Sequence, residues 1–225
     1  MSFTSNYGCT GALLNDRWVI STVTCTNYYL VENTLILVGA VSQREGDVYI
    51  CEAIKNHENF DSATLENDIA LLRSNRPILF TQYVQPIPYF RGPLEPCKTT
   101  LVGYKEVHNG MFSSGNYWTF YMEVSTISKR ECQALLSDLG RPELYDAKSI
   151  CVLAKIDDSD SYYLNDICMN RGGEPLVPSG SRVLLGLSSR KMYDCTSNSP
   201  FAFTEVSQFS DWIESNTNVT GVDVL

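Results

Sequence analysis

Short apolar runs separated by polar turns occupy most of the chain, which is the pattern of an all-β protein. Residues 8–25 contain two apolar runs on either side of Asn15, Asp16 and Arg17, and this arrangement predicts a β-hairpin. Residues 35–41 and 48–54 are rich in Leu, Ile and Val and predict two further strands. Strand patterning returns at residues 99–105 and 118–127.

Two segments carry helix signals. Ser128 and Glu131 have the spacing of a capping box, so a short helix is expected to run to about Asp138. Val206, Phe209 and Ile213 recur at helical spacing and predict a C-terminal helix over residues 206–216. Prolines are dense in residues 77–96, so a connector without regular structure, residues 86–98, is expected between two halves of the chain.

The composition of the chain argues against several classes of function. The 225 residues can bury a substantial core in one large domain or two small ones that share an interface. The net charge of −9 argues against a nucleic-acid partner, because affinity for phosphate comes mainly from Lys and Arg. No apolar run approaches the roughly 20 residues of a membrane-spanning helix, so we expect a soluble protein without a membrane partner.

The cysteines indicate an oxidising compartment. There are eight, without a Cys-x-x-Cys pair, and only two histidines accompany them, so a disulfide framework is favoured over a zinc site. We therefore expect a secreted protein. No metal and no cofactor is expected. Met1 is followed directly by polar residues, so any leader has been removed or was never part of this sequence. His57 and His108 are interpreted as surface histidines.

Residues 168–175 read Cys-Met-Asn-Arg-Gly-Gly-Glu-Pro. They have the length and ends of the nucleophile loop of trypsin-like serine proteases, Cys-x-Gly-Asp-Ser-Gly-Gly-Pro. Alone, this match is equally well met by an ordinary Gly-Gly turn in a disulfide-bonded β protein. Two further stretches agree with it in the same order: residues 18–25 resemble the family's Trp-Val-Leu-Thr-Ala-Ala-His-Cys, and residues 67–72, Asn-Asp-Ile-Ala-Leu-Leu, match its segment around the catalytic aspartate.

The resemblance to trypsin-like serine proteases covers nearly the whole chain. It implies a single unit, residues 1–225, of two six-stranded antiparallel β-barrels with a short intermediate helix and a C-terminal helix. The implied parts are a first barrel, residues 1–85, the connector 86–98, a second barrel, residues 99–205, and the helix 206–216.

The resemblance also implies that the catalytic machinery is degenerate. Thr24 takes the place of the histidine base, Gly172 that of the serine nucleophile, and only Asp68 of the triad is retained. Since a buried carboxylate needs partners, Asp68 is expected to accept hydrogen bonds from Ser189 and Thr24. Asn170 replaces the glycine that supplies an oxyanion donor, and Arg171 replaces the aspartate that pairs with the N-terminal amine of active enzymes.

The specificity pocket is expected to be blocked. Asp166 matches the acidic floor that selects basic side chains, but the wall glycines are replaced by Phe201 and by Arg190 or Lys191. We expect one of these cations to neutralise Asp166.

The resemblance implies three disulfides, Cys9–Cys25, Cys132–Cys151 and Cys168–Cys195. Cys51 and Cys97 are left over, and we expect them to form a bridge between a first-half strand and the connector, although two free thiols are the alternative. Asn218 begins the N-glycosylation sequon Asn-Val-Thr.

Among trypsin-like proteases the sequence is most similar to those of mites, including the group 3 mite allergens and the scabies mite inactivated protease paralogues. This implies a secreted, extracellular, monomeric binding protein of the mite gut lumen whose partners are host plasma or complement proteins and which inhibits complement. A regulatory cofactor or decoy for an active protease is the alternative, and a residual trypsin-like peptidase is a more remote one.

Overall fold

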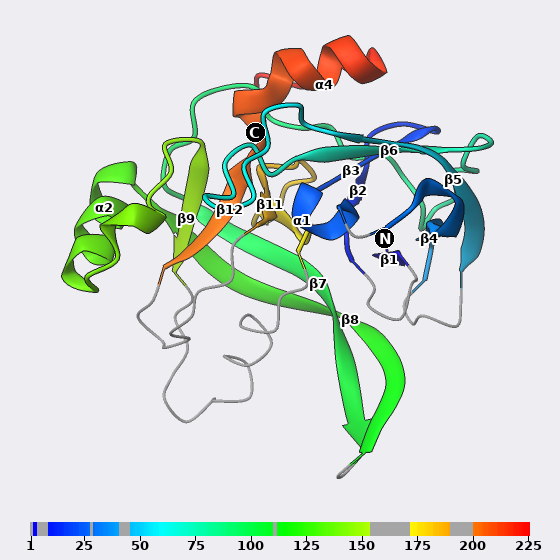
Figure 1. The fold of residues 1–225 in the computed structure, drawn as a ribbon, viewed down its shortest axis with the longest axis horizontal. Coiled ribbons are helices and arrows are strands. Elements are labelled where there is room, and N and C mark those ends of the chain that lie inside the picture. The colour runs from blue at the N-terminus through cyan, green and yellow to red at the C-terminus, as the bar shows by residue number, and fades with distance from the viewer. Residues whose placement is uncertain are drawn as a thin grey trace.

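Two antiparallel sheets of six strands each form the body of the protein in the computed structural model (Figure 1). The structure describes residues 2–3, 9–27, 29–40, 46–109, 112–153, 172–189 and 200–225, with the backbone alone for residues 2–3, 104–109, 112–118 and Leu144. The first sheet has the order β1-β4-β5-β6-β3-β2, and the second is a closed barrel, β10-β11-β12-β9-β8-β7. The predicted all-β fold with two six-stranded antiparallel units is therefore confirmed.

The strands of the first sheet are β1 (Ser2–Phe3), β2 (Ala12–Leu13), β3 (Trp18–Ser21), β4 (Leu35–Val38), β5 (Asp47–Asn56) and β6 (Ala70–Ser74). The second sheet contains β7 (Lys98–Asn109), β8 (Phe112–Ile127), β9 (Ser149–Leu153), β10 (Pro175–Pro178), β11 (Gly186–Ser188) and β12 (Phe201–Glu205). The predicted hairpin is β2–β3, in which the Asn15 side chain accepts hydrogen bonds from the Arg17 and Trp18 backbone N–H groups, each at 2.8 Å.

Short helices lie at the edges of the sheets. They are α1 (Val23–Thr26), η1 (Val31–Asn33), α2 (Lys129–Asp138), η2 (Pro142–Leu144), η3 (Val206–Phe209) and α4 (Ser210–Thr217). The expected cap of α2 is present, because Ser128 Oγ accepts a hydrogen bond from the Glu131 N–H at 3.2 Å. The C-terminal helix lies in the predicted segment, but its first turn, η3, is a 3₁₀ helix and only α4 is an α-helix.

Side chains of both halves meet in a buried seam. Each sheet has its own apolar core, and a third apolar cluster combines Ile20, Ile69 and Leu71 of the first half with Leu187 and Phe209 of the second. Along β3, Val19 packs in the first core and Ile20 in the seam, since successive strand side chains point to opposite faces. The seam places the residues that follow β11 next to the residues that precede β6.

Two isolated β-bridges join the proline-rich connector to the second half. Tyr89 forms an isolated bridge with Leu184, and Phe90 forms one with Val222. The connector ends where β7 begins, and β7 and β8 form a hairpin that is longer than the predicted strands and projects from the barrel (Figure 1). The sequence around residues 108–116 is rich in Gly, Asn and Ser. Because Gly and Asn are uncommon in strands, the sequence did not predict that both strands continue here.

The structure contains the disulfides Cys9–Cys25 and Cys132–Cys151, while Cys168 and Cys195 lie outside the described residues. The expected Cys51–Cys97 bridge is wrong, because both residues are free cysteines. Cys51 is buried in the core of the first sheet, whereas Cys97 packs against the core of the second. The two thiols belong to different cores, so the bridge cannot form in this fold.

Candidate functional site

Asp68 lies at the centre of the candidate site, in the seam between the two halves. Asp68 is only 1% exposed, and it directly precedes the buried Ile69 and strand β6. Asn67 before it has a positive φ of 56°, which turns the chain into the strand. The Asp68 carbonyl accepts a hydrogen bond from Thr204 Oγ1 of β12 at 2.9 Å. Contacts from both halves therefore hold the aspartate in place.

Three donors converge on the Asp68 carboxylate. The Thr24 backbone N–H donates to Oδ1 at 2.8 Å, and the Thr24 hydroxyl donates to Oδ2 at 2.8 Å. The Ser189 hydroxyl donates to Oδ2 at 2.5 Å. Thr24 belongs to α1 and Ser189 follows β11, so the hydrogen bonds expected from the sequence are present and join the two halves.

The surroundings of Asp68 have opposing effects on its acidity. Burial raises the pKa of the Asp68 carboxyl above its ordinary value, and the hydrogen bonds from Ser189 and Thr24 act in the opposite direction without cancelling the effect. Desolvation is therefore the stronger influence on this carboxylate.

Gly172 lies next to the segment that contains Thr24. A Cβ atom built on Gly172 would lie 3.0 Å from Cys25 Sγ, 3.4 Å from Thr22 Oγ1 and 3.6 Å from Thr24 Oγ1. The residue has φ +92°, a conformation that L side chains rarely adopt. The structure thus brings together the three positions that the sequence resemblance assigns to the triad, Thr24, Asp68 and Gly172.

Backbone hydrogen bonds from both halves of the protein hold Gly172 and Gly173 in the seam. The Thr10 N–H donates to the Gly172 carbonyl at 3.2 Å, and the Gly173 N–H donates to the Ser188 carbonyl at 2.8 Å. A Cβ atom on Gly173 would lie 2.0 Å from the Thr10 carbonyl oxygen, so only glycine fits there. These contacts fix the backbone at Gly172.

The chemistry that this arrangement can perform is limited. The side chains bonded to the Asp68 carboxylate are the hydroxyls of Thr24 and Ser189, and the Thr24 hydroxyl also lies 3.1 Å from Thr22 Oγ1. His57, the histidine whose side chain the structure describes, packs instead against the rings of Phe209 and Trp212. Among the described residues, no group of three or more His, Cys, Asp or Glu side chains could hold a metal ion.

Only part of the expected specificity pocket can be placed. Phe201 is 5% exposed and packs in the core of the second barrel, paired in register with Val152 of β9. Asp166, Asn170, Arg171, Arg190 and Lys191 lie outside the described residues. The blocked pocket and the neutralised Asp166 therefore stay predictions.

A buried polar pair beside the site had no role in the sequence-based predictions. Glu174 is 2% exposed, and its backbone N–H donates to Ser188 Oγ at 2.9 Å, while the Ser188 hydroxyl donates to the Glu174 carboxylate. The signal available in the sequence was a charged residue that directly follows Gly172–Gly173 and precedes an apolar strand. A carboxylate is thus buried two residues from the nucleophile position.

The sequon residue Asn218 is exposed at the C-terminal end of α4, in the left-handed conformation with φ 57°. The Thr220 hydroxyl of the same sequon donates to Glu214 Oε1 at 2.8 Å. Within the described part of the chain, none of the helices has the length and apolar character to cross a membrane.

The chain is similar in sequence to known serine proteinases. The chain is 27% identical to a trypsin of Phaedon cochleariae over 219 residues, covering 94% of this chain and 79% of the relative. It is 26% identical to serine proteinase stubble of Drosophila melanogaster over 224 residues, and the match spans only 27% of that longer protein.

Two solved structures share the fold. HL collagenase superposes with a TM-score of 0.74 at 22% identity, covering 97% of this chain and 93% of the collagenase. The scabies mite inactivated protease paralogue S-D1 superposes with a TM-score of 0.73 at 16% identity, covering 96% and 90% of the two chains. The trypsin family model matches residues 1–213, and the chain therefore belongs to the trypsin family.

Proposed function

We propose that this protein is a catalytically inactive trypsin homologue, a pseudoprotease that acts by binding other proteins. The observation that carries the proposal is the arrangement around Asp68: its carboxylate is occupied by Thr24 and Ser189 at the place where active relatives orient a histidine. Gly172 at the nucleophile position has no side chain, and threonine is not a base near neutral pH.

The expected loss of activity is large. In subtilisin, removal of the nucleophile or the base alone lowers kcat by roughly 10⁶-fold. Here both groups are replaced, by Gly172 and Thr24. Asp68 is left without the serine and the histidine with which it works in active relatives, so residual peptide hydrolysis is not expected.

The structural similarity to a scabies mite inactivated protease paralogue supports the proposal that this protein is catalytically inactive. From the resemblance to that group, we further propose that the protein is secreted into the gut lumen of a parasitic mite as a monomer. Its proposed partners are host plasma or complement proteins, and its proposed effect is inhibition of complement.

The test combines an activity assay with a binding assay. The purified protein is incubated with a chromogenic lysyl or arginyl peptide and with an active-site phosphonate, and an active insect trypsin serves as the positive control. In parallel, purified complement proteins are tested for retention on the immobilised chain, and complement lysis is measured in serum.

Absence of turnover together with retention of a complement protein and reduced lysis supports the proposal. Specific phosphonate labelling would identify a residual peptidase instead. Faster cleavage by the control trypsin in the presence of this chain would favour the cofactor alternative. If no complement protein is retained and lysis is unchanged, the complement role is wrong.

A further inference from the structure

A cavity of about 260 Å³ lies beside the edge strand β2, between the two sheets. Its walls come from β2, the end of β4, residues 83–87 and the strands β7 and β10. Every lining residue that the structure describes is uncharged. An apolar cavity of roughly 150 Å³ can already hold a benzene molecule. This cavity therefore has room for at least one large apolar side chain.

The first sheet is open at this cavity. β1 and β2 are the two ends of its strand order, whereas the second sheet closes into a barrel. Ser2 of β1 lies opposite Leu37 of β4, and the next residues along the chain, Val38 and Gly39, line the cavity. On the other side the cavity is lined by β2. The cavity therefore lies in the gap between the two ends of the sheet.

The β2 edge beside the cavity carries a buried N–H group without a partner among the described residues. The Leu14 N–H donates to the Trp18 carbonyl of β3, so Leu13 directs its own N–H and carbonyl groups to the opposite side. The Leu13 carbonyl accepts a hydrogen bond from the Ile87 N–H at 2.8 Å, but no described residue accepts one from the Leu13 N–H. The backbone groups of Gly11, which also lines the cavity, have no described partner either. Leu13 is only 6% exposed, and buried backbone groups are normally paired, so this edge is available for pairing with another backbone.

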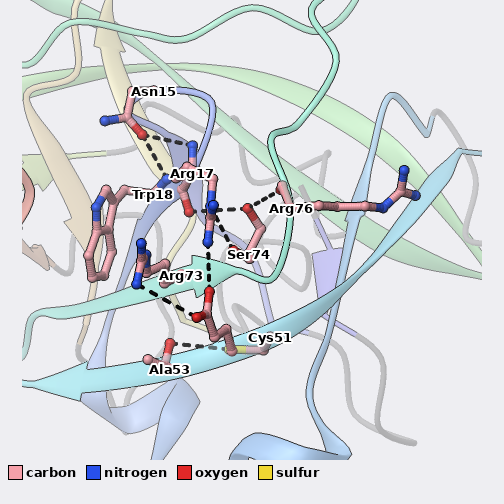
Figure 2. A network of polar contacts seen from close by, with 9 residues as sticks. Asn15, Arg17, Trp18, Cys51, Ala53, Arg73, Ser74 and Arg76 are labelled. Atoms are coloured by element: carbon pink, nitrogen blue, oxygen red, sulfur yellow. Dashed lines mark hydrogen bonds and ion pairs between the residues drawn. The ribbon is translucent and has the colours of Figure 1, made fainter.

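The hairpin that carries this edge is held in place from its other side (Figure 2). The Asn15 side chain accepts hydrogen bonds in the turn, and Arg17 donates from Nε to the Ser74 carbonyl at 2.9 Å. The Ser74 N–H donates in return to the Arg17 carbonyl at 2.9 Å. A binding edge that is already fixed loses little conformational entropy when a ligand binds.

Tyr83 lies at the mouth of the cavity. It is 82% exposed and also lines the cavity. The Thr81 hydroxyl accepts hydrogen bonds from the Tyr83 and Val84 N–H groups, each at 3.1 Å, and Val84 packs in the first core. The turn therefore presents an aromatic ring on a fixed backbone, and tyrosine is enriched at protein interfaces.

Two properties of the site specify its occupant. An unpaired sheet edge binds an extended backbone, because each free N–H or carbonyl group can pair with a neighbouring strand. The uncharged lining favours apolar side chains, since a charge buried there would have no partner. Alternate side chains of a strand lie on the same face, so the occupant can fill the cavity while its backbone pairs with β2.

We infer that the β2 edge and the adjoining cavity form a docking site for an extended, uncharged apolar segment of a partner protein. The segment adds to the first sheet as a further strand, pairs with the backbone of Gly11 and Leu13, and places an apolar side chain in the cavity beside Tyr83. The inference rests on the proposed function, because it assigns the surface through which a non-catalytic homologue binds proteins.

The test uses fluorescence polarisation with a defined probe. The probe is a fluorescein-labelled, C-terminally amidated peptide of sequence Gly-Ser-Val-Thr-Leu-Thr-Val-Ser, which carries no charge of its own and favours an extended backbone. Val177→Glu places a charge in the cavity lining and should raise Kd by about tenfold or more. Val224→Glu, at a 77% exposed position outside the lining, is the matched control and should leave Kd unchanged.

Tyr83→Ser removes the exposed ring and should raise Kd by about three- to tenfold, whereas Tyr83→Phe keeps the ring and should bind like the unmodified protein. Thermal unfolding shows whether each variant is folded.

Two further peptides test the binding mode without changing the protein. A peptide that is N-methylated at valine, leucine and valine cannot donate backbone hydrogen bonds at these positions and should not bind. A peptide with glutamate in place of leucine should not bind either, because its charge would be buried without a partner.

Hydrogen exchange measured by NMR locates the bound probe. At a probe concentration of about ten times Kd, exchange of the Leu13 amide should slow by about tenfold, because roughly nine-tenths of the molecules are occupied.

The inference is overturned if the probe does not bind at up to about 1 mM, if the N-methylated peptide binds equally well, or if the Leu13 amide exchanges at an unchanged rate. A dimer in analytical ultracentrifugation that the probe dissociates would assign the edge to a second copy and would also overturn it. Retention of a complement protein by Val177→Glu would remove this surface as the site while leaving the proposed function intact. Probe binding at β2 without retention of any complement protein would uphold the docking site and remove the complement role.

Discussion

Thr24 occupies both carboxylate oxygens of Asp68, with its backbone N–H 2.8 Å from Oδ1 and its hydroxyl 2.8 Å from Oδ2. In active relatives this aspartate orients a histidine. Here a shorter side chain, that of Thr24, donates a hydrogen bond to the same buried carboxylate. The aspartate thus has a structural role at the seam between the two halves.

Asp68→Ala should destabilise the fold without changing any peptidase activity. The substitution leaves the half-buried Thr24 and Ser189 donors without their partner, which costs about 2–4 kcal/mol in the free energy of unfolding. Urea denaturation measures the change, and Asp223→Ala at an exposed position is the control. Equal stability of the two variants would contradict a structural role for Asp68.

The stability contributed by Asp68 should fall with rising pH. Burial raises the folded-state pKa of this carboxyl above its unfolded value. The contribution is therefore complete below the unfolded pKa, about 3.9, and is lost as pH rises through the folded pKa. We expect the difference in unfolding free energy between the unmodified protein and Asp68→Asn to decrease from pH 4 to pH 7, whereas a constant difference would show that the carboxyl does not titrate differently on folding.

Introducing histidine and serine at the positions that resemble those of the triad should not produce peptidase activity. In Thr24→His/Gly172→Ser, the serine must adopt φ +92° with its Cβ 3.0 Å from the Cys25 disulfide sulfur. We expect no hydrolysis of a chromogenic arginyl substrate and a loss of about 1–3 kcal/mol of stability from Gly172→Ser. Gly180→Ser is the matched control, since Gly180 also has positive φ but open space around it, and turnover by the double variant would contradict the prediction.

His57 should make the protein less stable in mild acid. Its ring centre lies 5.1 Å from that of Trp212 and 5.5 Å from that of Phe209, and its Nδ1 accepts a hydrogen bond from the Asn59 N–H. Burial lowers the pKa of His57; nearby Lys148 lowers it further, and Glu58 opposes the shift. The stability that neutral His57 contributes is therefore present above its unfolded pKa, about 6.5, and is lost as pH falls through the lower folded pKa.

The measurement for His57 compares thermal unfolding from pH 7 to pH 5. The melting temperature of the unmodified protein should fall more than that of His57→Phe, which keeps an aromatic ring but cannot titrate. Parallel curves for the two proteins would contradict the prediction.

The two free cysteines should react at different rates. Cys51 is buried and its pKa is raised to about 11, chiefly by burial, so its reactive thiolate is scarce at pH 8. Cys97 is half-buried and should be labelled first by iodoacetamide in the native protein. Peptide mapping locates the label, and both residues should react after unfolding in the absence of a reductant. A Cys51–Cys97 peptide that survives such unfolding would contradict the structure.

Much of the architecture follows from local pattern. The strand alternation and the Ser128 cap follow from short-range sequence, and the order of the Trp18, Asp68 and Gly172 landmarks carries the resemblance to the family and to its triad positions. Family membership can be recognised from those landmarks even though every reported identity is below 30%.

Other features depend on contacts between distant segments. The separation of Cys51 and Cys97 into different cores, the positive φ of Gly172, the buried Glu174–Ser188 pair and the cavity beside the β2 edge required the tertiary structure. Pairing register and burial arise only when strands far apart in the sequence pack together, and no local pattern encodes those distances. The sequence by itself determined which chemical groups are present at the positions that resemble the triad, and only the tertiary structure decided what those groups contact.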